Sequence, residues 1–142
     1  MVINRNLVEK KLVILGDFIR QIDQMDFDEI GLTEEKDIQQ LLSFRLQQAV
    51  ETAIDIATHL LAGLSLERKE TAKDVFELMG KEKIISAELA KNMMLACDFR
   101  NLVVHGYQKI DFHRLFYDYK EDLEDLREFA RRINDFLNKN NS

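Results

Sequence analysis

The stretch RNLVVHGY, residues 100–107, places an arginine, a histidine and a tyrosine around an apolar Leu-Val-Val run. Histidine suits general acid and base catalysis because the pKa of its side chain lies near neutrality. Arginine suits phosphate recognition because its planar guanidinium group matches the geometry of phosphate oxygens. Arg100 and His105 are therefore the first candidates for chemistry at a phosphate group.

Cleavage of RNA without a metal ion requires three functional groups. A base deprotonates the 2′-hydroxyl, an acid protonates the leaving 5′-oxygen, and a fixed cation stabilises the charge of the phosphorane. One chain offers a single well-placed histidine, whereas a two-fold dimer brings two copies of Arg100 and His105 to one cleft. This chemistry predicts a homodimer, in which one histidine is the acid and the other is the base.

The spacing of the two residues does not by itself bring them together. Five residues correspond to about 140° of rotation on an unbroken helix, so Arg100 and His105 point to different faces, and Asn101 points elsewhere again. They meet only if the helix loosens near Val104, which the following Gly106 allows. The spacing leaves an alternative open, in which Arg100 makes a surface ion pair and His105 simply ends the helix.

The remaining titratable residues give weaker signals. Asp55 and His59 share one helix face, a spacing that suits a metal ion, but structural zinc needs about four ligands. An orienting hydrogen bond is therefore the favoured interpretation. His113 begins the last predicted helix and is expected in solvent, with a ligand contact as the alternative because the motif is near. Cys97 lies on an apolar face and is interpreted as a small core residue.

Other catalytic patterns do not occur in the sequence. There is no glycine-rich phosphate loop, no Cys-x-x-Cys and no His-Glu-x-x-His. The acidic segment 23–35 lacks the glycine and ligand spacing of a calcium loop. We therefore expect neither a metal ion nor a cofactor.

Length and composition indicate one folded domain, residues 1–142. The chain is 46% hydrophobic and 32% charged, which allows a buried core. No apolar run approaches the roughly 20 residues that a bilayer span requires, so no membrane partner is expected. A single cysteine cannot form an internal disulfide, which favours the reducing cytoplasm.

The net charge of −6 argues against a surface that binds nucleic acid everywhere. It is compatible with a small basic site on an acidic body, or with a partner that carries a basic surface. If RNA binds, the positive charge near the motif must come from a few residues of each chain: Arg100, Lys109, Arg114, Lys91 and Arg45.

Apolar residues recur at steps of three and four along most of the chain, and there is no proline and little glycine. This pattern predicts helices over residues 4–25, over 33–61 with Thr33 as its cap, over 71–79, over 86–104 and over 111–137. The segment 23–35 is interpreted as a loop. Gly63 and Gly80 are predicted to stop the second and third helices, Ser86 and Asp111 to cap the last two, and Gly106 to end the motif region.

No alternating strand pattern is present, and the Leu-Val-Val run is kept helical because it has no partner strand. The predicted fold class is all-α: an antiparallel bundle of four long helices plus one short helix.

The motif also resembles a known family. RNLVVHGY fits the Arg-x4-His-x-Tyr signature of the HepT toxins, a branch of the HEPN superfamily of small α-helical ribonucleases. The residue after the arginine is typically polar in that superfamily, and here it is Asn101. The segments FRLQQAVETAIDIATHLL and DFRNLVVHGYQKID are similar to the corresponding parts of these proteins, as are the length and the helical content.

The resemblance implies a specific function. HepT-like proteins are toxins of type II toxin–antitoxin systems and metal-independent endoribonucleases, with a composite site at the dimer cleft. Transferred to this sequence, Arg100 and His105 are the catalytic pair and Asn101 is a supporting polar group. Lys109 and Arg114 are possible RNA contacts because of their charge near the motif, and not because of the resemblance.

The resemblance also implies a partner, a minimal nucleotidyltransferase (MNT) antitoxin that transfers AMP to the motif tyrosine, here Tyr107. A bulky anion at Tyr107 repels the phosphates of RNA in the cleft. The plain interpretation of Tyr107 is a packed ring with its hydroxyl in solvent, and both interpretations can hold together.

An alternative function belongs to a different class. A non-catalytic HEPN-type binding module would use the same cleft to hold a nucleotide or a nucleotidyltransferase without cleaving RNA. The presence of both Arg100 and His105 favours the enzyme, since a scaffold needs neither. An inert helical bundle explains the apolar stripes but not RNLVVHGY.

Overall fold

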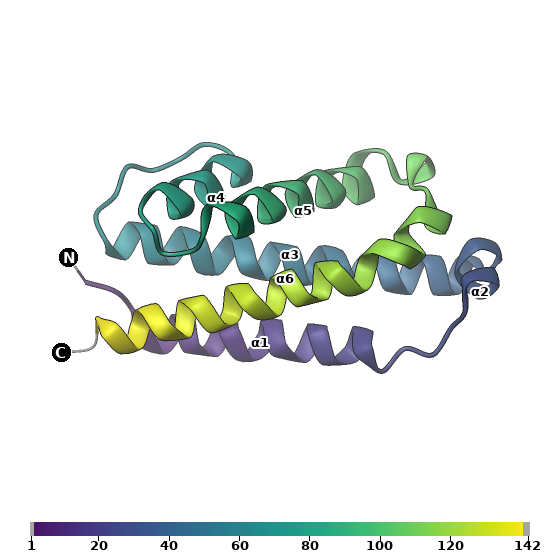
Figure 1. The fold of residues 1–142 in the computed structure, drawn as a ribbon, viewed down its shortest axis with the longest axis horizontal. Helices are drawn as coiled ribbons and strands as arrows, with labels where there is room; N and C mark the ends of the chain where they lie inside the picture. Colours follow the sequence, from purple (N-terminus) through teal and green to yellow (C-terminus); the bar gives the residue numbers. More distant parts are fainter. Residues whose placement is uncertain (1, 141–142) are drawn as a thin grey trace.

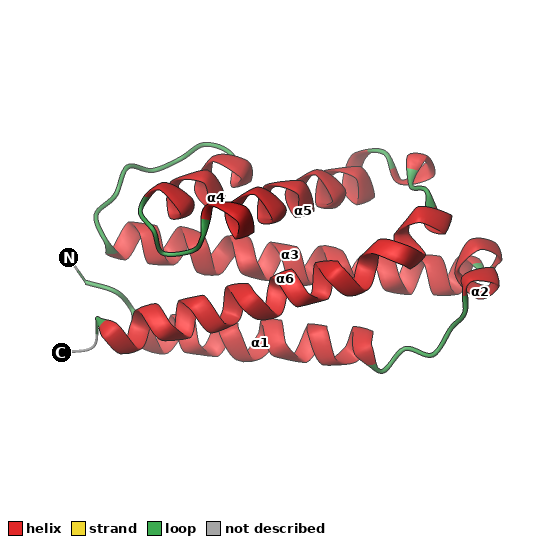
Figure 2. Cartoon of the chain, viewed as in Figure 1, coloured by secondary structure: helices red, strands yellow, loops and turns green. Residues whose placement is uncertain are grey.

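The computed structural model describes residues 2–140 of the chain. This part contains six α-helices, one 3-10 turn and no strand (Figure 2). The elements are α1 (Arg5–Asp23), α2 (Glu29–Glu34), α3 (Lys36–Gly63), α4 (Ala72–Lys81), α5 (Ala87–His105), the 3-10 turn η1 (Tyr107–Lys109) and α6 (Phe112–Lys139). The predicted all-α fold class is therefore confirmed.

The four long helices α1, α3, α5 and α6 form the bundle, and they alternate in direction along the chain (Figure 1). The short helix α4 packs on α5 and α3 at one end of the bundle, which we call the α4 end. The opposite end contains α2, the last turn of α5, η1 and the first turn of α6 (Figure 1). We call it the motif end, because residues 100–107 lie there.

The core is continuous from one end of the bundle to the other. Its large, fully buried side chains come from every helix, since the apolar stripes face inward: Leu15, Ile22, Leu32, Leu42, Leu46, Ile56, Leu60, Phe76, Met79, Met93, Leu123 and Phe129. The Phe76 ring of α4 meets the Phe129 ring of α6 edge to face, with the ring centroids 5.7 Å apart. None of the helices in residues 2–140 combines the length and apolar composition that a bilayer crossing requires.

Three predicted helix starts are confirmed by their caps. The Ser86 side chain accepts a hydrogen bond from the Leu89 backbone N–H at 3.0 Å, and the Asp111 side chain accepts one from Arg114 N–H at 3.1 Å. Thr71 caps α4 in the same way through Asp74 N–H. Each cap satisfies a backbone donor that the first helical turn leaves free, which fixes where the helix begins.

The segment between α1 and α3 differs from the prediction, because it contains the six-residue helix α2 and not only a loop. Asp28 caps α2 by accepting from Gly31 N–H at 2.7 Å. Thr33 lies inside α2, where its hydroxyl donates to the Glu29 carbonyl, so its assignment as the cap of the next helix is wrong. The helix α3 begins after Glu35, which makes no side-chain cap.

Two glycines were also misinterpreted as helix stops. Gly63 is the last residue of α3, and Gly80 lies inside α4, which continues to Lys81. A Cβ atom on Gly63 would lie 2.8 Å from the Val2 carbonyl oxygen, and one on Gly80 would lie 2.8 Å from Cβ of Ala90. Both glycines therefore permit close packing between segments.

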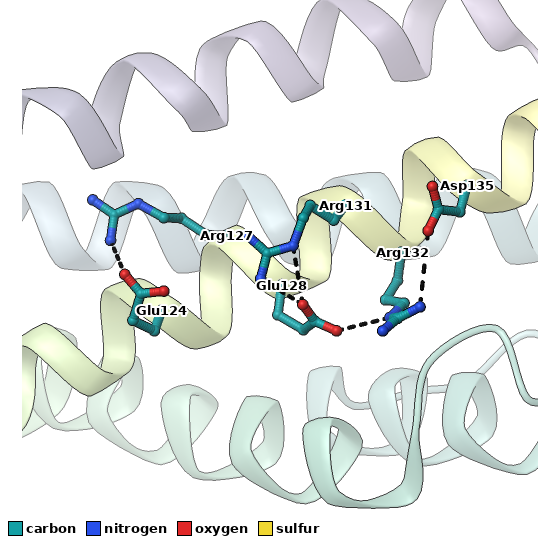
Figure 3. A network of polar contacts seen from close by, with 6 residues as sticks. All are labelled: Glu124, Arg127, Glu128, Arg131, Arg132 and Asp135. Atoms are coloured by element: carbon teal, nitrogen blue, oxygen red, sulfur yellow. Dashed lines mark hydrogen bonds and ion pairs between the residues drawn. The ribbon is translucent and has the colours of Figure 1, made fainter.

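The outer face of α6 carries a chain of ion pairs (Figure 3). Arg127 pairs with Glu124, while Glu128 accepts from Arg131 at 2.6 Å and from Arg132 at 2.8 Å. The hydrogen bonds from these two arginines lower the pKa of the Glu128 carboxyl. Exposed pairs of this kind stabilise the fold little. Their consequence here is that the arginines of α6 in this segment are already matched by carboxylates.

Candidate functional site

The motif lies at the end of α5, and the helix stays regular through it. Residues 101–105 are all α-helical, so the Leu-Val-Val run is helical as predicted. Gly106 is the first residue outside α5, and its N–H donates to the Leu102 carbonyl at 2.8 Å. The helix therefore does not loosen near Val104, so the condition under which Arg100 and His105 of one chain would meet is not fulfilled. Because α5 is unbroken, Arg100 and His105 of one chain face different directions.

Arg100 points across the bundle toward α3. Its side chain is 22% exposed, and Nη1 lies 2.7 Å from Oε1 of Glu51. Its Nε atom is buried and makes no hydrogen bond within residues 2–140. The alternative of an ion pair is thus found, but in a partly buried form that links two helices. Glu51 was missed by the sequence analysis, since a contact across 49 residues leaves no local pattern.

His105 and Asn101 are exposed at the surface of α5. In the part of the chain that the structure describes, neither side chain makes a hydrogen bond or an ion pair, so both are available to a ligand. The His105 imidazole closes the last turn of α5.

Tyr107 begins η1 and packs its ring against Phe112, with the ring centroids 5.9 Å apart. Its hydroxyl oxygen is buried and has no hydrogen-bond partner within residues 2–140. The expectation of a hydroxyl in solvent is therefore wrong. A buried hydroxyl without a partner loses its hydrogen bonds to water without compensation.

The residues expected to contact RNA are at the surface but are not all free. Lys109 is exposed, and Arg114, with 80% of its side chain exposed, pairs with Asp118 at 3.3 Å. Arg45 donates to the Gln21 carbonyl at 3.1 Å, and Lys91 is exposed. Lys109 and Arg114 are close enough to line one groove, whereas the structure does not join Lys91 or Arg45 to it.

His113 is exposed, as predicted, and its Nδ1 lies 2.9 Å from Oε1 of Glu29 in α2. Tyr117, one turn later, donates to the other oxygen of Glu29, and this hydrogen bond raises the pKa of the Tyr117 hydroxyl. These contacts hold α2 on the start of α6. They account for His113 without a ligand.

The remaining candidates have structural roles. Asp55 accepts from Lys11 at 3.2 Å, while His59 is exposed. Within residues 2–140 no group of three or more His, Cys, Asp or Glu side chains is arranged to hold a metal ion. Cys97 is buried, as predicted, and burial raises the pKa of its thiol to about 11, so the thiol is neutral and unreactive.

An exposed apolar patch lies beside the motif. Phe44 is 53% exposed and Val104 is 50% exposed, and Leu41 lies one turn before Phe44. Phe44 is seven residues from Glu51 on α3, and Val104 is four residues from Arg100 on α5, so both share the helix faces that carry the Arg100–Glu51 pair. We call Leu41, Phe44 and Val104 the apolar patch.

The sequence matches the ribonuclease HepT-like family over residues 4–133. It is 30% identical over 135 residues to the tRNA nuclease HepT of Aphanizomenon flos-aquae, covering 92% of this chain and 90% of the relative. The chain belongs to the HepT-like family. The mRNA nuclease HepT of Shewanella oneidensis is 25% identical over 124 residues, covering 87% of this chain and 93% of the relative.

The fold of this HepT-like chain agrees with the sequence relationship. The tri-AMPylated HEPN toxin of S. oneidensis, solved in complex with its MNT antitoxin, is similar with a TM-score of 0.86 and 25% identity, covering 92% of this chain and 98% of that one. The cytosolic protein YutE of Bacillus subtilis shares the fold, with a TM-score of 0.84 and 17% identity over 98% of this chain and 94% of that one. The predicted family is confirmed, and with it the prediction of an endoribonuclease toxin.

Proposed function

We propose that this HepT-like toxin cleaves RNA without a metal ion at a cleft between two copies of the chain. The observation that carries the proposal is the unbroken helix α5, which keeps Arg100 and His105 of one chain on different faces. A single chain therefore does not surround one phosphate with an acid, a base and a cation. A second copy supplies the missing imidazole, so one His105 is the base and the other is the acid.

The apolar patch supports the two-chain arrangement. Leu41, Phe44 and Val104 expose large apolar side chains next to the motif, where a solvated surface would favour polar residues. Burial of these side chains against a second copy removes them from water and brings the two motif ends together. The interface then lies beside the groups that do the chemistry.

Arg100 stabilises the developing charge in this scheme. The Glu51 carboxylate holds the guanidinium of Arg100 on the α3 side, and the scissile phosphate competes with Glu51 for its donors. Asn101, exposed next to Arg100, supports the phosphate with a neutral hydrogen bond. Lys109 and Arg114 extend the positive charge along the flanking RNA, and Arg114 exchanges its contact with Asp118 for a phosphate.

An MNT-type antitoxin that AMPylates Tyr107 is the regulatory part of the proposal. The S. oneidensis relative was solved as a tri-AMPylated toxin with an MNT antitoxin, and Tyr107 is the motif tyrosine of this chain. The hydroxyl is buried, so Tyr107 must leave its packing against Phe112 before AMP is attached. An attached AMP keeps the residue out and sets negative charge at the cleft, which repels RNA. The proposed place of action is the cytoplasm, where the unmodified toxin meets its RNA substrate.

The main test compares the wild type with His105→Ala in bacteria and with purified RNA in the presence of EDTA. The proposal predicts that the wild type arrests growth and cleaves RNA, and that the variant does neither although it is folded. Equal harmlessness of both unmodified proteins would favour the non-catalytic binding module. The partly buried Arg100–Glu51 pair is the observation behind that second candidate, since it gives Arg100 a structural role.

The proposal for Tyr107 is tested by intact mass after co-expression with an MNT-type partner. The mass is expected to rise by one or more AMP units in the wild type and to stay constant in Tyr107→Phe. A mass that rises equally in Tyr107→Phe contradicts the assignment of this residue.

A further inference from the structure

A groove separates α5 from α6. Its volume is about 850 Å³, and Leu46 and Val50 of α3 form its floor. Figure 1 shows α3 behind the space between α5 and α6. The walls contribute further apolar side chains, among them Phe99, Leu102 and Leu95, and Leu95 is 58% exposed. Leu46 and Val50 are themselves buried, so the apolar surface that the groove leaves accessible comes from its walls, above all from Leu95.

The α6 wall of the groove is strongly acidic. It carries Asp118, Glu121, Asp122, Glu124 and Asp125, and α5 adds Asp98. Three of these carboxylates already have cations, because Asp98 pairs with Lys73, Asp118 with Arg114 and Glu124 with Arg127. Glu121, Asp122 and Asp125 have no cation partner in the part of the chain described.

Asp122 is the carboxylate that the chain leaves least satisfied. It makes no hydrogen bond or ion pair within residues 2–140, whereas Asp125 accepts from the Asn92 amide at 3.3 Å. Burial raises the pKa of the Asp122 carboxyl to about 6, with further contributions from Asp125, Asp118 and Glu121. Burial also raises the pKa of Asp125. A cation placed in the groove would relieve both effects.

The chemistry of the lining selects the occupant. Phosphates of RNA would meet carboxylates along α6, so RNA is disfavoured beyond the end that carries Lys109 and Arg114. A second copy docked face to face across a two-fold axis would set the acidic walls against each other. An apolar floor with acidic walls fits a segment that has apolar residues on one side and lysine or arginine on its flanks.

The dimensions fit a short helix. The α5 wall extends from Asn92 to Leu102, which corresponds to about 15 Å, or nearly three helical turns. An amphipathic helix of that length places two or three apolar anchors at i, i+3 and i+7 on the floor.

We propose that the α5–α6 groove is a docking site for a basic amphipathic helix of a partner protein. Its apolar face covers Leu95 and the partly exposed Phe99 and Leu102, and a lysine or arginine pairs with Asp122. The proposed contacts use neither Arg100 nor His105, although one end of the groove carries Lys109 and Arg114, which the proposed function assigns to RNA.

The test uses a fluorescent helical peptide of about 15 residues with leucines on one face and lysines flanking them. Its fluorescence anisotropy is measured with the full chain and with Asp122→Asn/Asp125→Asn. The control, Asp26→Asn/Asp37→Asn, removes the same two charges at exposed positions outside the groove. The groove variant is expected to lose about tenfold or more in affinity, while the control matches the wild type.

Two further measurements make the result specific. Backbone amide resonances of α5 and α6 are expected to shift on titration with the lysine peptide and not with a glutamate version. Equal affinity of the two double variants, or shifts confined to other faces, overturns the proposal. If Leu95→Lys converts a dimer into monomers in sedimentation, the groove belongs to the interface between copies and the proposal also fails.

Discussion

The two ends of the bundle differ in how fully one chain packs and hydrogen-bonds its own side chains. At the α4 end, Phe76 packs on Phe129 and Gly80 lets α4 approach α5 closely. At the motif end, the Arg100 Nε and the Tyr107 hydroxyl are buried without partners in residues 2–140. The apolar patch is exposed beside them. The α4 end can be explained by one chain alone, whereas the motif end has the features of a surface that another molecule completes.

This difference separates stability from function. Fully packed side chains fix the positions of α5 and α6, and α5 in turn presents the motif. Unpaired polar groups and exposed apolar groups cost folding free energy, so their concentration at one end is a signature of a binding surface. Substitutions at the α4 end should therefore change unfolding, and substitutions at the motif end should change activity or assembly.

The largest effect is expected from His105→Ala. Loss of a general acid or base typically reduces a rate by about 10²–10⁴-fold, and both roles are lost here. The side chain is exposed and makes no hydrogen bond or ion pair in residues 2–140, so the unfolding midpoint should stay unchanged. Cleavage of labelled RNA and thermal unfolding are measured side by side. His59→Ala is the matched control, because His59 is also exposed but lies near the C-terminus of α3, at the α4 end of the bundle. It should retain full activity.

A pair of phenylalanines gives the clearest test of the contrast. Phe129→Ala empties a fully buried position and should lower the free energy of unfolding by about 3–5 kcal/mol. Phe44→Ala, at an exposed position, should change it by no more than about 0.5 kcal/mol but weaken the proposed dimer. Urea unfolding of the isolated chain and sedimentation at several concentrations separate the two effects. A Phe44→Ala protein that dimerises like the wild type would remove the apolar patch from the interface.

Local sequence rules predicted the parts of this fold that depend on local structure. Ser86 and Asp111 were identified as caps because a cap is a contact over three residues. The short helix α2 was missed, since six residues are too few to show an apolar period. Gly63 was misread because its close contact is with Val2, far away in the sequence.

The candidate site shows the same division. The motif residues could be chosen from their types and spacing, and α5 was correctly kept helical through Val104. The Arg100–Glu51 pair and the burial of the Tyr107 hydroxyl could not be predicted from the sequence, because both depend on how α5 and η1 pack against other elements. The sequence also gave no signal for the acidic groove, whose lining comes from α3, α5 and α6.

Asp122→Asn tests whether an unsatisfied group also lies away from the motif end. The folded-state pKa of Asp122 is raised from 3.8 to about 6, so the folded chain disfavours the ionised form. This penalty on the folded state is absent below the unfolded pKa of 3.8. It grows between that pH and the folded pKa of about 6, and it is complete above about pH 6. The variant should therefore be more stable than the wild type by about 1–3 kcal/mol at neutral pH, after allowance for partial exposure, and equally stable near pH 4.

Urea unfolding at the two pH values measures the Asp122 effect, and Asp26→Asn at an exposed position should show no such pH dependence. A gain in stability together with weaker binding of the basic peptide would show that the carboxylate is kept for a partner, at the expense of the fold. A loss of stability at neutral pH would mean that Asp122 is satisfied in solution.

The smallest effect is expected from Glu51→Gln. The pair with Arg100 spans two helices but is partly exposed, with 22% and 40% of the two side chains accessible, so its loss should lower stability by less than about 1 kcal/mol. The neutral amide competes less with a phosphate for Arg100, so the KM for RNA should fall about two- to tenfold while kcat stays nearly constant. Glu51→Asp keeps the charge and should behave more like the wild type. A fall in kcat with unchanged KM would instead show that Glu51 positions Arg100 for catalysis. The Arg100–Glu51 pair would then be a contact at the motif end that one chain satisfies by itself.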